Sequence, residues 1–188
     1  MLYIGVAGAV VLIILIWFVI SYNTLVKQRV LYKEAFSGMD VFMKKRYDLI
    51  PNLVEIVKGY ATHETQTIES AISARNRAAD SGQNDSIDKR IKCESELSGS
   101  VLRLMAVAEQ YPELKADAQF LNLSQQLSAI ETDISQARKY YNGAIRQYNT
   151  KIALFPVNIV ASIGRFSEQP FFELSDTNER AVSQVKFN

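Results

Sequence analysis

The segment from Phe120 to Phe155 restricts the fold of this chain more than any other. Its apolar residues recur at intervals of three and four for about five heptads, a coiled-coil-like pattern that predicts a long helix with one continuous apolar seam. Pro112 suits the first turn of such a helix, and Pro156 ends the pattern. We therefore predict one helix over residues 113–155, on the order of 60 Å long at about 1.5 Å per residue. The seam consists of Phe120, Leu123, Leu127, Ile130, Ile134, Ala137, Tyr141, Ala144, Tyr148, Ile152 and Phe155.

Three shorter segments with the same helical spacing precede this one, over residues 22–47, 51–79 and 87–110. Residues 80–88, DSGQNDSID, have the composition of a loop. Because short connections between long helices make antiparallel neighbours, we predict an all-α fold with an antiparallel four-helix up-and-down bundle over residues 22–156. The apolar faces are Leu25, Tyr32, Phe36, Met39, Met43 and Tyr47; then Leu53, Val57, Tyr60, Ile68, Ala71 and Ala78; then Ile87, Ile91, Leu97, Val101, Leu104 and Ala108.

The junction between the first two of these segments allows two interpretations. Ile50 precedes a proline and is pushed away from helical backbone angles, while Asp48 can cap a new helix with Pro51 in its first turn. This favours a corner at residues 48–51. The alternative is a kinked continuous helix that ends at residues 59–62, where a glycine is followed by a capping threonine.

Residues 2–20, LYIGVAGAVVLIILIWFVI, carry no charge and have the length needed to cross a bilayer. A cleaved signal peptide is the alternative, but it requires a basic start and a small-residue cleavage site. We predict a single-pass transmembrane anchor at residues 1–21, with Trp17 and Tyr22 near its inner end. The positive residues that follow keep their side of the membrane cytoplasmic, so the N-terminus is expected outside and the bundle inside. They are Lys27, Arg29, Lys33, Lys44, Lys45 and Arg46.

Residues 157–188 differ from the helical segments and form a predicted membrane-proximal C-terminal tail. If the last bundle helix runs back toward the membrane, residues 157–166 lie at the bilayer surface. Arg165 is the only charged residue among them, so the segment suits the membrane interface. Packing across the open end of the bundle is the alternative.

The residues give no pattern for catalysis, a cofactor or a metal. A di-iron site in a bundle requires Glu-x-x-His motifs, whereas the chain has one histidine, His63, with Tyr60 three residues before it. The single cysteine, Cys93, is expected roughly 16 Å along the bundle axis from the level of His63, too far for a nucleophile pair. Phosphate-binding glycine loops are missing from the sequence, and a net charge of +1 gives no reason to expect nucleic-acid binding. We predict no catalytic, cofactor-binding or metal residues.

The dipeptide Tyr-Asn occurs three times, at residues 22–23, 141–142 and 148–149. One interpretation is a polar layer that fixes the register of the helices. The other is a set of ordinary core and interfacial tyrosines, whose rings are buried while their hydroxyls reach water.

Four stretches together resemble the LemA family: YNTLV at 22–26, RYDLIPNLVEIVKGYATHE at 46–64, LRLMAVAEQYPELKADAQFLNLSQQL at 102–127 and ARKYYNGAIRQYNTKIALFP at 137–156. The apolar N-terminus and PFFEL at 170–174 continue the match. The resemblance implies a bacterial inner-membrane protein with a cytoplasmic helical bundle and offers no catalytic residues. Members are often encoded beside membrane metalloproteases or other envelope proteins, which implies a partner role.

We therefore expect a non-enzymatic scaffold or adaptor that contacts the lipid bilayer and associates with itself. The alternative is a partner or regulator of a membrane metalloprotease or an envelope-stress system. Self-association is predicted because the helices carry apolar residues outside the seam, and exposed apolar patches mark interaction sites. These residues are Leu31, Val41, Phe42, Ile56, Ile72, Met105 and Val107.

Overall fold

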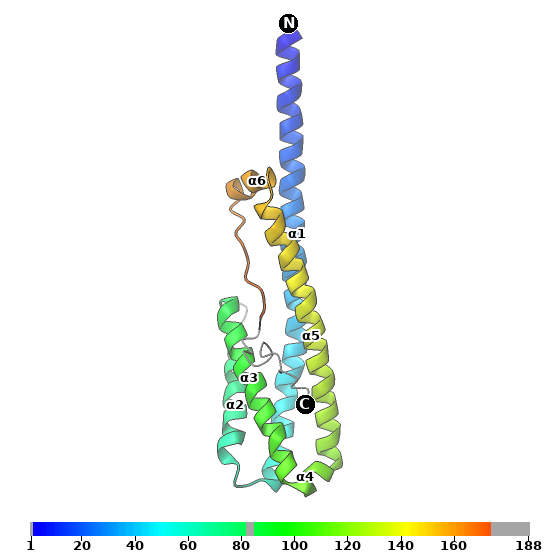
Figure 1. Ribbon diagram of the computed structural model, residues 1–188, viewed down its shortest axis with the longest axis vertical. Coiled ribbons are helices and arrows are strands. Elements are labelled where there is room, and N and C mark those ends of the chain that lie inside the picture. The colour runs from blue at the N-terminus through cyan, green and yellow to red at the C-terminus, as the bar shows by residue number, and fades with distance from the viewer. Residues whose placement is uncertain (1, 82–84, 174–188) are drawn as a thin grey trace, which may run out of the picture. The chain divides into compact units, whose positions relative to one another are not determined.

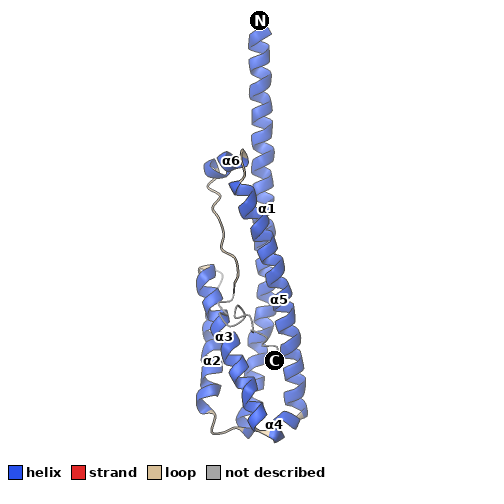
Figure 2. Cartoon of the chain, in the orientation of Figure 1, coloured by secondary structure: helices blue, strands red, loops and turns tan. Residues whose placement is uncertain are grey.

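The computed structural model describes residues 2–81 and 85–173 and consists of helices joined by short connections (Figures 1 and 2). Over these residues it contains no strand. The prediction of an all-α chain is confirmed. The loop predicted at 80–88 is described only at its two ends, and residues 174–188 of the tail lie outside the described part of the chain.

The first helix, α1, runs without interruption from Leu2 to Tyr60, with Pro51 inside it. The corner predicted at residues 48–51 is therefore wrong, and the alternative end near residues 59–62 is the one observed. The reason is packing: Ile50, Leu53 and Val57 are all fully buried, and their side of the helix continues the buried side that contains Met43. A corner would break this continuous apolar face, whose burial outweighs the backbone preference before proline.

The remaining helices are α2 (Thr65–Asp80), α3 (Ile87–Val107), a 3₁₀ turn η1 (Ala108–Gln110), α4 (Pro112–Ala116), α5 (Ala118–Ala153) and α6 (Val157–Ile163). Pro112 begins α4, as predicted. The single helix predicted over 113–155 is broken at Asp117, which is extended. Oδ1 of Asp117 accepts hydrogen bonds from the backbone N–H groups of Gln119 and Phe120 at 2.8 and 2.9 Å and so caps α5.

Two predicted core residues are exposed for local reasons. Tyr60 lies at the end of α1, where its hydroxyl donates a 2.9 Å hydrogen bond to Oδ2 of Asp117. Phe155 lies beyond the end of α5 at Ala153, so it no longer follows the helical seam. The rest of the seam remains buried or half-buried from Phe120 to Ile152.

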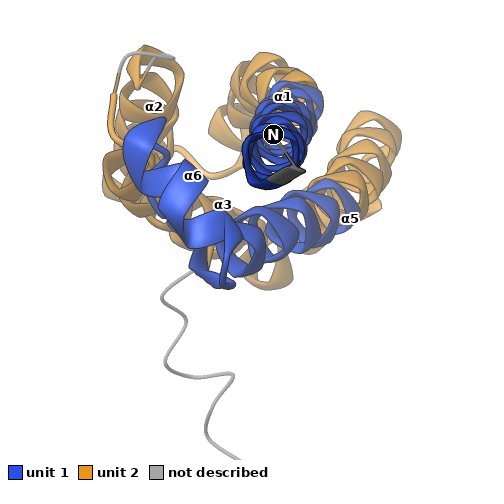
Figure 3. Cartoon of the chain, turned by 90° about the horizontal axis from the view of Figure 1, so that it is seen from above, with its two compact units in different colours: residues 1–40, 136–171 blue, residues 41–135, 172–188 orange. Residues whose placement is uncertain are grey.

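The chain divides into two compact units (Figure 3). Unit 1 comprises residues 1–40 and 136–171, and unit 2 comprises residues 41–135 and 172–188. The helices α1 and α5 contribute residues to both units. The division predicted from the sequence was based on expected function rather than on packing, and it stays a prediction. Its segments are residues 1–21, 22–156 and 157–188.

Within unit 2, α2 and α3 lie side by side and run in opposite directions (Figure 1). Ser70 pairs with Ser100 and Arg77 with Glu96, so the residue number rises along one helix as it falls along the other. The buried face of α2 is made of small residues, Ala71, Ala74 and Ala78, together with Ile68. Small side chains let the backbones of neighbouring helices approach closely.

Within unit 1, aromatic residues of α1 and α5 pack against one another in the core. The rings of Tyr32 and Tyr148 lie 5.0 Å apart, and those of Phe36 and Tyr141 lie 5.5 Å apart. Because aromatic pairs prefer such tilted and edge-on geometries, these contacts stabilise the pairing of the two helices beyond the area they bury. The pairing also shows that α1 and α5 run in opposite directions here.

After α6 the chain returns along α5 without regular structure. Asn149 accepts a 3.0 Å hydrogen bond from the backbone N–H of Gln169 and donates a 2.8 Å bond to its carbonyl. The hydroxyl of Tyr141 donates to the carbonyl oxygen of Pro170 at 3.3 Å. Two of the three Tyr-Asn dipeptides therefore use buried tyrosine rings for packing, and the polar contacts of Asn149 and Tyr141 hold the returning segment of the tail.

Candidate functional site

The most concentrated polar chemistry in the described residues is a cluster in the core of unit 2, around Arg46. Its guanidinium donates hydrogen bonds to Glu94 and Ser98 of α3 and to Glu131 of α5. The distances from Nη1 are 2.7 Å to Oε1 of Glu131 and 3.2 Å to Oγ of Ser98. The hydroxyl of Tyr47 donates to the second carboxylate oxygen of Glu94. Both Arg46 and Glu94 are buried, whereas the side chain of Glu131 is 39% exposed.

Helical spacing explains why these charges point inward. Arg46 follows the buried Met43 by three residues and precedes the buried Ile50 by four, so it lies on the apolar face of α1. Glu94 stands three residues from both Ile91 and Leu97 on the buried face of α3. From the sequence alone, Arg46 is one of the cations that follow the apolar stretch 2–20. Its place in the apolar spacing of α1 was the signal that could have revealed the cluster.

The surroundings of Arg46 and Tyr47 favour the protonated form of each. Burial alone would lower the pKa of Arg46, but the carboxylates of Glu94 and Glu131 outweigh it and raise that pKa. Burial raises the pKa of the Tyr47 hydroxyl, and the neighbouring charge of Glu94 raises it further. Arg46 therefore stays cationic and Tyr47 stays protonated at neutral pH. Because Arg46 and Tyr47 keep their protons, the cluster is better suited to holding three helices together than to transferring protons.

A groove of about 440 Å³ between α3 and α5 reaches this cluster from the surface. Glu131 lines it together with Leu102, Met105 and several small side chains, among them Ser98 and Ser128. The groove therefore joins an exposed apolar residue, Leu102, to the partly exposed end of the ion-pair cluster. Such a surface can receive an apolar side chain or helix from a partner.

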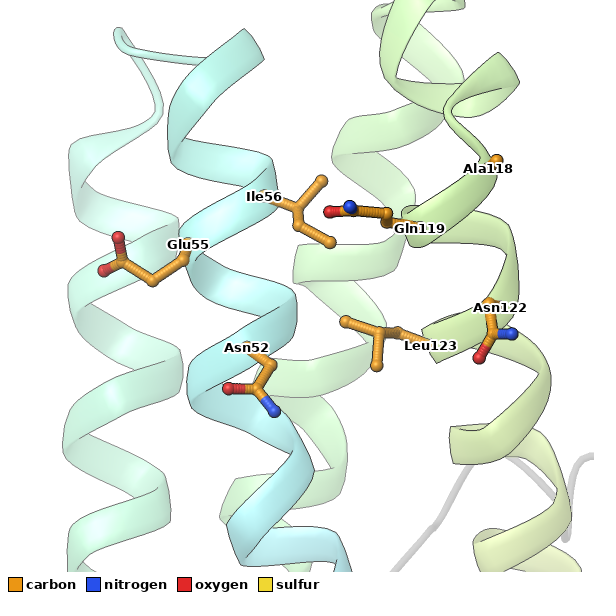
Figure 4. A pocket seen from close by; sticks show the side chains of 7 residues that line it. All are labelled: Asn52, Glu55, Ile56, Ala118, Gln119, Asn122 and Leu123. Atoms are coloured by element: carbon orange, nitrogen blue, oxygen red, sulfur yellow. The ribbon is translucent and has the colours of Figure 1, made fainter.

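A second hollow of about 540 Å³ lies between α1 and the start of α5 (Figure 4). Figure 4 shows the side chains of Ile56, Gln119 and Leu123 pointing into the space between the two helices, whereas Glu55 points away from α5. Asn52, Ala118 and Asn122 complete its lining. Glu55 is the one ionisable residue of this lining, and the other lining residues carry amide or apolar side chains, so the hollow brings no pair of catalytic groups together.

The two residues considered for a nucleophile pair lie on different elements and differ in exposure. His63 is exposed in the turn between α1 and α2, as expected for a solvated residue, and Cys93 is half-buried on α3. Over the residues that the structure describes, no group of three or more His, Cys, Asp or Glu side chains is arranged to hold a metal ion.

Comparisons with known proteins agree with the resemblance noted in the sequence. Magnetosome protein MamQ 2 of Paramagnetospirillum magneticum is 23% identical over 175 residues, covering 81% of this chain and 64% of that protein. Protein LemA of Metamycoplasma hominis is 26% identical over 141 residues, covering 74% of this chain and 63% of that protein. The chain thus spans about 64% of the length of the magnetosome relative. A model of the LemA family matches residues 35–187, and on this evidence the chain belongs to the LemA family.

Proposed function

We propose that this chain is a non-enzymatic, membrane-anchored scaffold or adaptor at the cytoplasmic face of a bacterial inner membrane. This proposal is supported by the two different parts of the single helix α1. By length and composition its first part could cross a membrane, and its side chains there are almost all exposed. The same helix then continues into a packed helical unit, so an anchor and a protein-binding surface would share one element.

The arrangement of the soluble helices is part of the proposal. The pairs Arg46–Glu131 and Tyr60–Asp117 indicate that α1 and α5 run in opposite directions in unit 2, and α2 and α3 do so as well. We infer an antiparallel four-helix up-and-down bundle, anchored by residues 1–21. Its polar core cluster would hold the helices in one register, which is the property a scaffold requires.

The orientation follows from the charges after the apolar segment. Lys27, Arg29 and Lys33 lie within about 15 residues of its end, the range in which positive side chains set topology. The N-terminus would be outside and the packed helices in the cytoplasm. The test is a pair of reporter fusions after Asn188, one active only in the cytoplasm and one active only after export.

We expect the cytoplasmic reporter to be active and the exported one silent. Lys27→Gln with Lys33→Gln should raise the exported signal. The matched control is Lys44→Gln with Lys45→Gln, which removes two exposed charges farther along the helix and should have a smaller effect. An active exported reporter on the unmodified chain would reverse the proposed orientation.

The alternative is a partner or regulator of a membrane metalloprotease or envelope-stress system. The groove between α3 and α5, with exposed Leu102 at its side, is the feature that favours it. Purified protein that forms a defined assembly alone supports the scaffold. Assembly only with a second polypeptide, recovered from detergent-solubilised membranes and lost on Leu102→Gln, supports the alternative.

A further inference from the structure

Four apolar side chains at the end of α5 and on α6 are exposed in unit 1: Leu154 (55%), Phe155 (78%), Ile159 (51%) and Ile163 (65%). Ile159 and Ile163 are one helical turn apart and share a face, while Val160 and Ala161 are buried. No charged residue occurs between Lys151 and Arg165, both of which are exposed. A surface of this composition is costly in water.

Phe166 attaches this segment to α1 just beyond the apolar stretch. Its ring packs edge-on against Tyr22 at 5.5 Å, and the guanidinium of Arg29 lies 5.2 Å from its centre. A turn at Gly164 and Arg165, whose φ is 54°, directs the ring onto α1. Gly164 permits this placement of the ring, because a Cβ there would lie 2.5 Å from the ring of Phe166 and 3.2 Å from that of Tyr22.

The position and direction of α6 match those of an interfacial helix. Tyr22 stands two residues after Ile20, the last residue of the apolar stretch 2–20 that we propose crosses the membrane. Within unit 1, α6 runs across the direction of α1 rather than along it (Figures 1 and 3). A helix perpendicular to a spanning helix, at the level where the span ends, lies in the plane of the membrane surface.

We propose that Leu154, Phe155, Ile159 and Ile163 insert into the cytoplasmic leaflet of the bilayer and form a second membrane contact beside the anchor. The exposed cations Lys151 and Arg165 flank the segment and suit anionic lipid headgroups. Burial of the four side chains would relieve their exposure to water and fix the angle of unit 1 to the membrane. The inference rests on the proposed anchor, because the anchor brings α6 to the lipid.

The single tryptophan, Trp17, gives a direct test. The full chain is reconstituted into vesicles of phosphatidylcholine and phosphatidylglycerol whose acyl chains carry bromine, a quencher of indole fluorescence. Three proteins are compared: the unmodified chain, Trp17→Phe with Phe155→Trp, and Trp17→Phe with Tyr140→Trp. Tyr140 is an exposed aromatic residue on α5, roughly 22 Å before Phe155 at helical rise, and serves as the matched control.

We expect the indole introduced by Phe155→Trp to lose fluorescence, more with bromine near the headgroup end of the chain than at its terminus. The Tyr140→Trp indole should be unaffected. Ile163→Trp, in the same Trp17→Phe background, should repeat the Phe155→Trp result, which guards against a local effect of one substitution.

The possible results test the second membrane contact independently of the proposed anchor. Quenching of Trp17 without quenching at positions 155 and 163 overturns the second contact and leaves the anchor standing. Unquenched but blue-shifted emission at these positions means that protein, such as a second copy, covers the face, and it also overturns the inference. An unquenched Trp17 removes the anchor on which the inference depends.

Discussion

At the scale of single residues, both side chains of the ion pair between Arg46 and Glu94 in unit 2 are buried. Arg46→Met leaves the buried carboxylate of Glu94 without the Arg46 side of its ion pair, and breaking a buried pair in this way destabilises proteins by roughly 3–5 kcal/mol. We therefore expect this substitution to lower the free energy of unfolding of the full chain in mild detergent, measured by denaturant titration with circular dichroism, by that amount.

The controls for this prediction use the same cluster. Glu131→Gln changes a half-exposed partner and should cost about 1 kcal/mol or less. Arg46→Met with Glu94→Leu removes both charges of this buried pair and should recover part of the loss. If Arg46→Met is as mild as Glu131→Gln, the cluster does not stabilise the packing of the three helices.

A second prediction at this scale concerns alkaline pH. Burial, with a smaller contribution from Tyr32, raises the pKa of Tyr141 from 10.0 to about 12. Between these values the unfolded chain has lost the proton and the folded chain retains it, so stability falls as the pH rises from about 10 to 12. Tyr141→Phe should reduce this fall, measured as the free energy of unfolding at several alkaline pH values.

Tyr140→Phe is the control for the alkaline prediction, because residue Tyr140 is 60% exposed. It should leave the pH dependence unchanged. Near neutral pH, Tyr141→Phe should cost about 1 kcal/mol through loss of the hydrogen bond to the Pro170 carbonyl. Equal alkaline slopes for the two variants would mean that Tyr141 ionises as easily in the folded chain as in the unfolded one.

At the scale of elements, α1 survives its internal proline because a neighbouring helix supplies the missing hydrogen bond. Pro51 has no N–H group for the carbonyl of Tyr47, four residues earlier. Nε of Arg75, on α2, donates to that carbonyl at 3.0 Å instead. The helix can therefore continue through the proline with its freed acceptor satisfied.

Because the Arg75 side chain replaces the N–H group that Pro51 lacks, substitutions of Pro51 and Arg75 should have coupled effects on stability. Arg75→Met should cost about 1 kcal/mol in the native background, because the Tyr47 carbonyl is left without its donor. In a Pro51→Ala background the alanine N–H replaces the lost donor, and Arg75→Met should cost clearly less. A double-mutant cycle of unfolding free energies measures the difference. If the effects of the two substitutions on the free energy of unfolding are additive, the Arg75 donor does not compensate for the missing N–H group of Pro51.

At the scale of the whole molecule, the apolar surface of unit 2 favours self-association. Val41 and Ile72, two of the residues on which the sequence prediction rests, are exposed, and Leu102 and Leu121 add to them. Val107 is buried and is removed from that set, since it faces the core side of α3. Leu31, Phe42, Ile56 and Met105 are half-buried. The apolar residues that remain exposed still favour contact with a second chain.

We predict a homo-oligomer of the full chain in mild detergent, measured by mass photometry or light scattering. Leu102→Gln tests a contact through the helices of unit 2. Gly8→Leu tests a contact through the apolar segment of α1, since small residues let helices in a membrane approach closely. A Cβ at Gly8 would meet nothing within 4 Å in its own chain, so a change in assembly reports a contact between chains. A monomer over a wide concentration range would contradict the prediction.

The sequence by itself determined the helical class, the apolar segment of α1 and the buried seam of α5. Each depends on spacing within one segment: the seam from Phe120 to Ile152 needs only the helical period, and Pro156 ends it without reference to other residues. Such local signals can be interpreted from a single chain. The family resemblance agreed with the membrane anchor already predicted from residues 2–20. It added the expectation of a partner role but no site residues.

The tertiary structure decided what happens where helices meet. Arg46 and Glu131 are 85 residues apart, so no local pattern pairs them. The donor that lets α1 pass through Pro51 comes from α2, and the level of α6 is set by the contact of Phe166 with Tyr22. Local preference predicted a corner at the proline, but burial of Ile50, Leu53 and Val57 across it outweighed that preference. Buried charges and freed backbone acceptors are stable only with their partners in place, and folding alone brings those partners together.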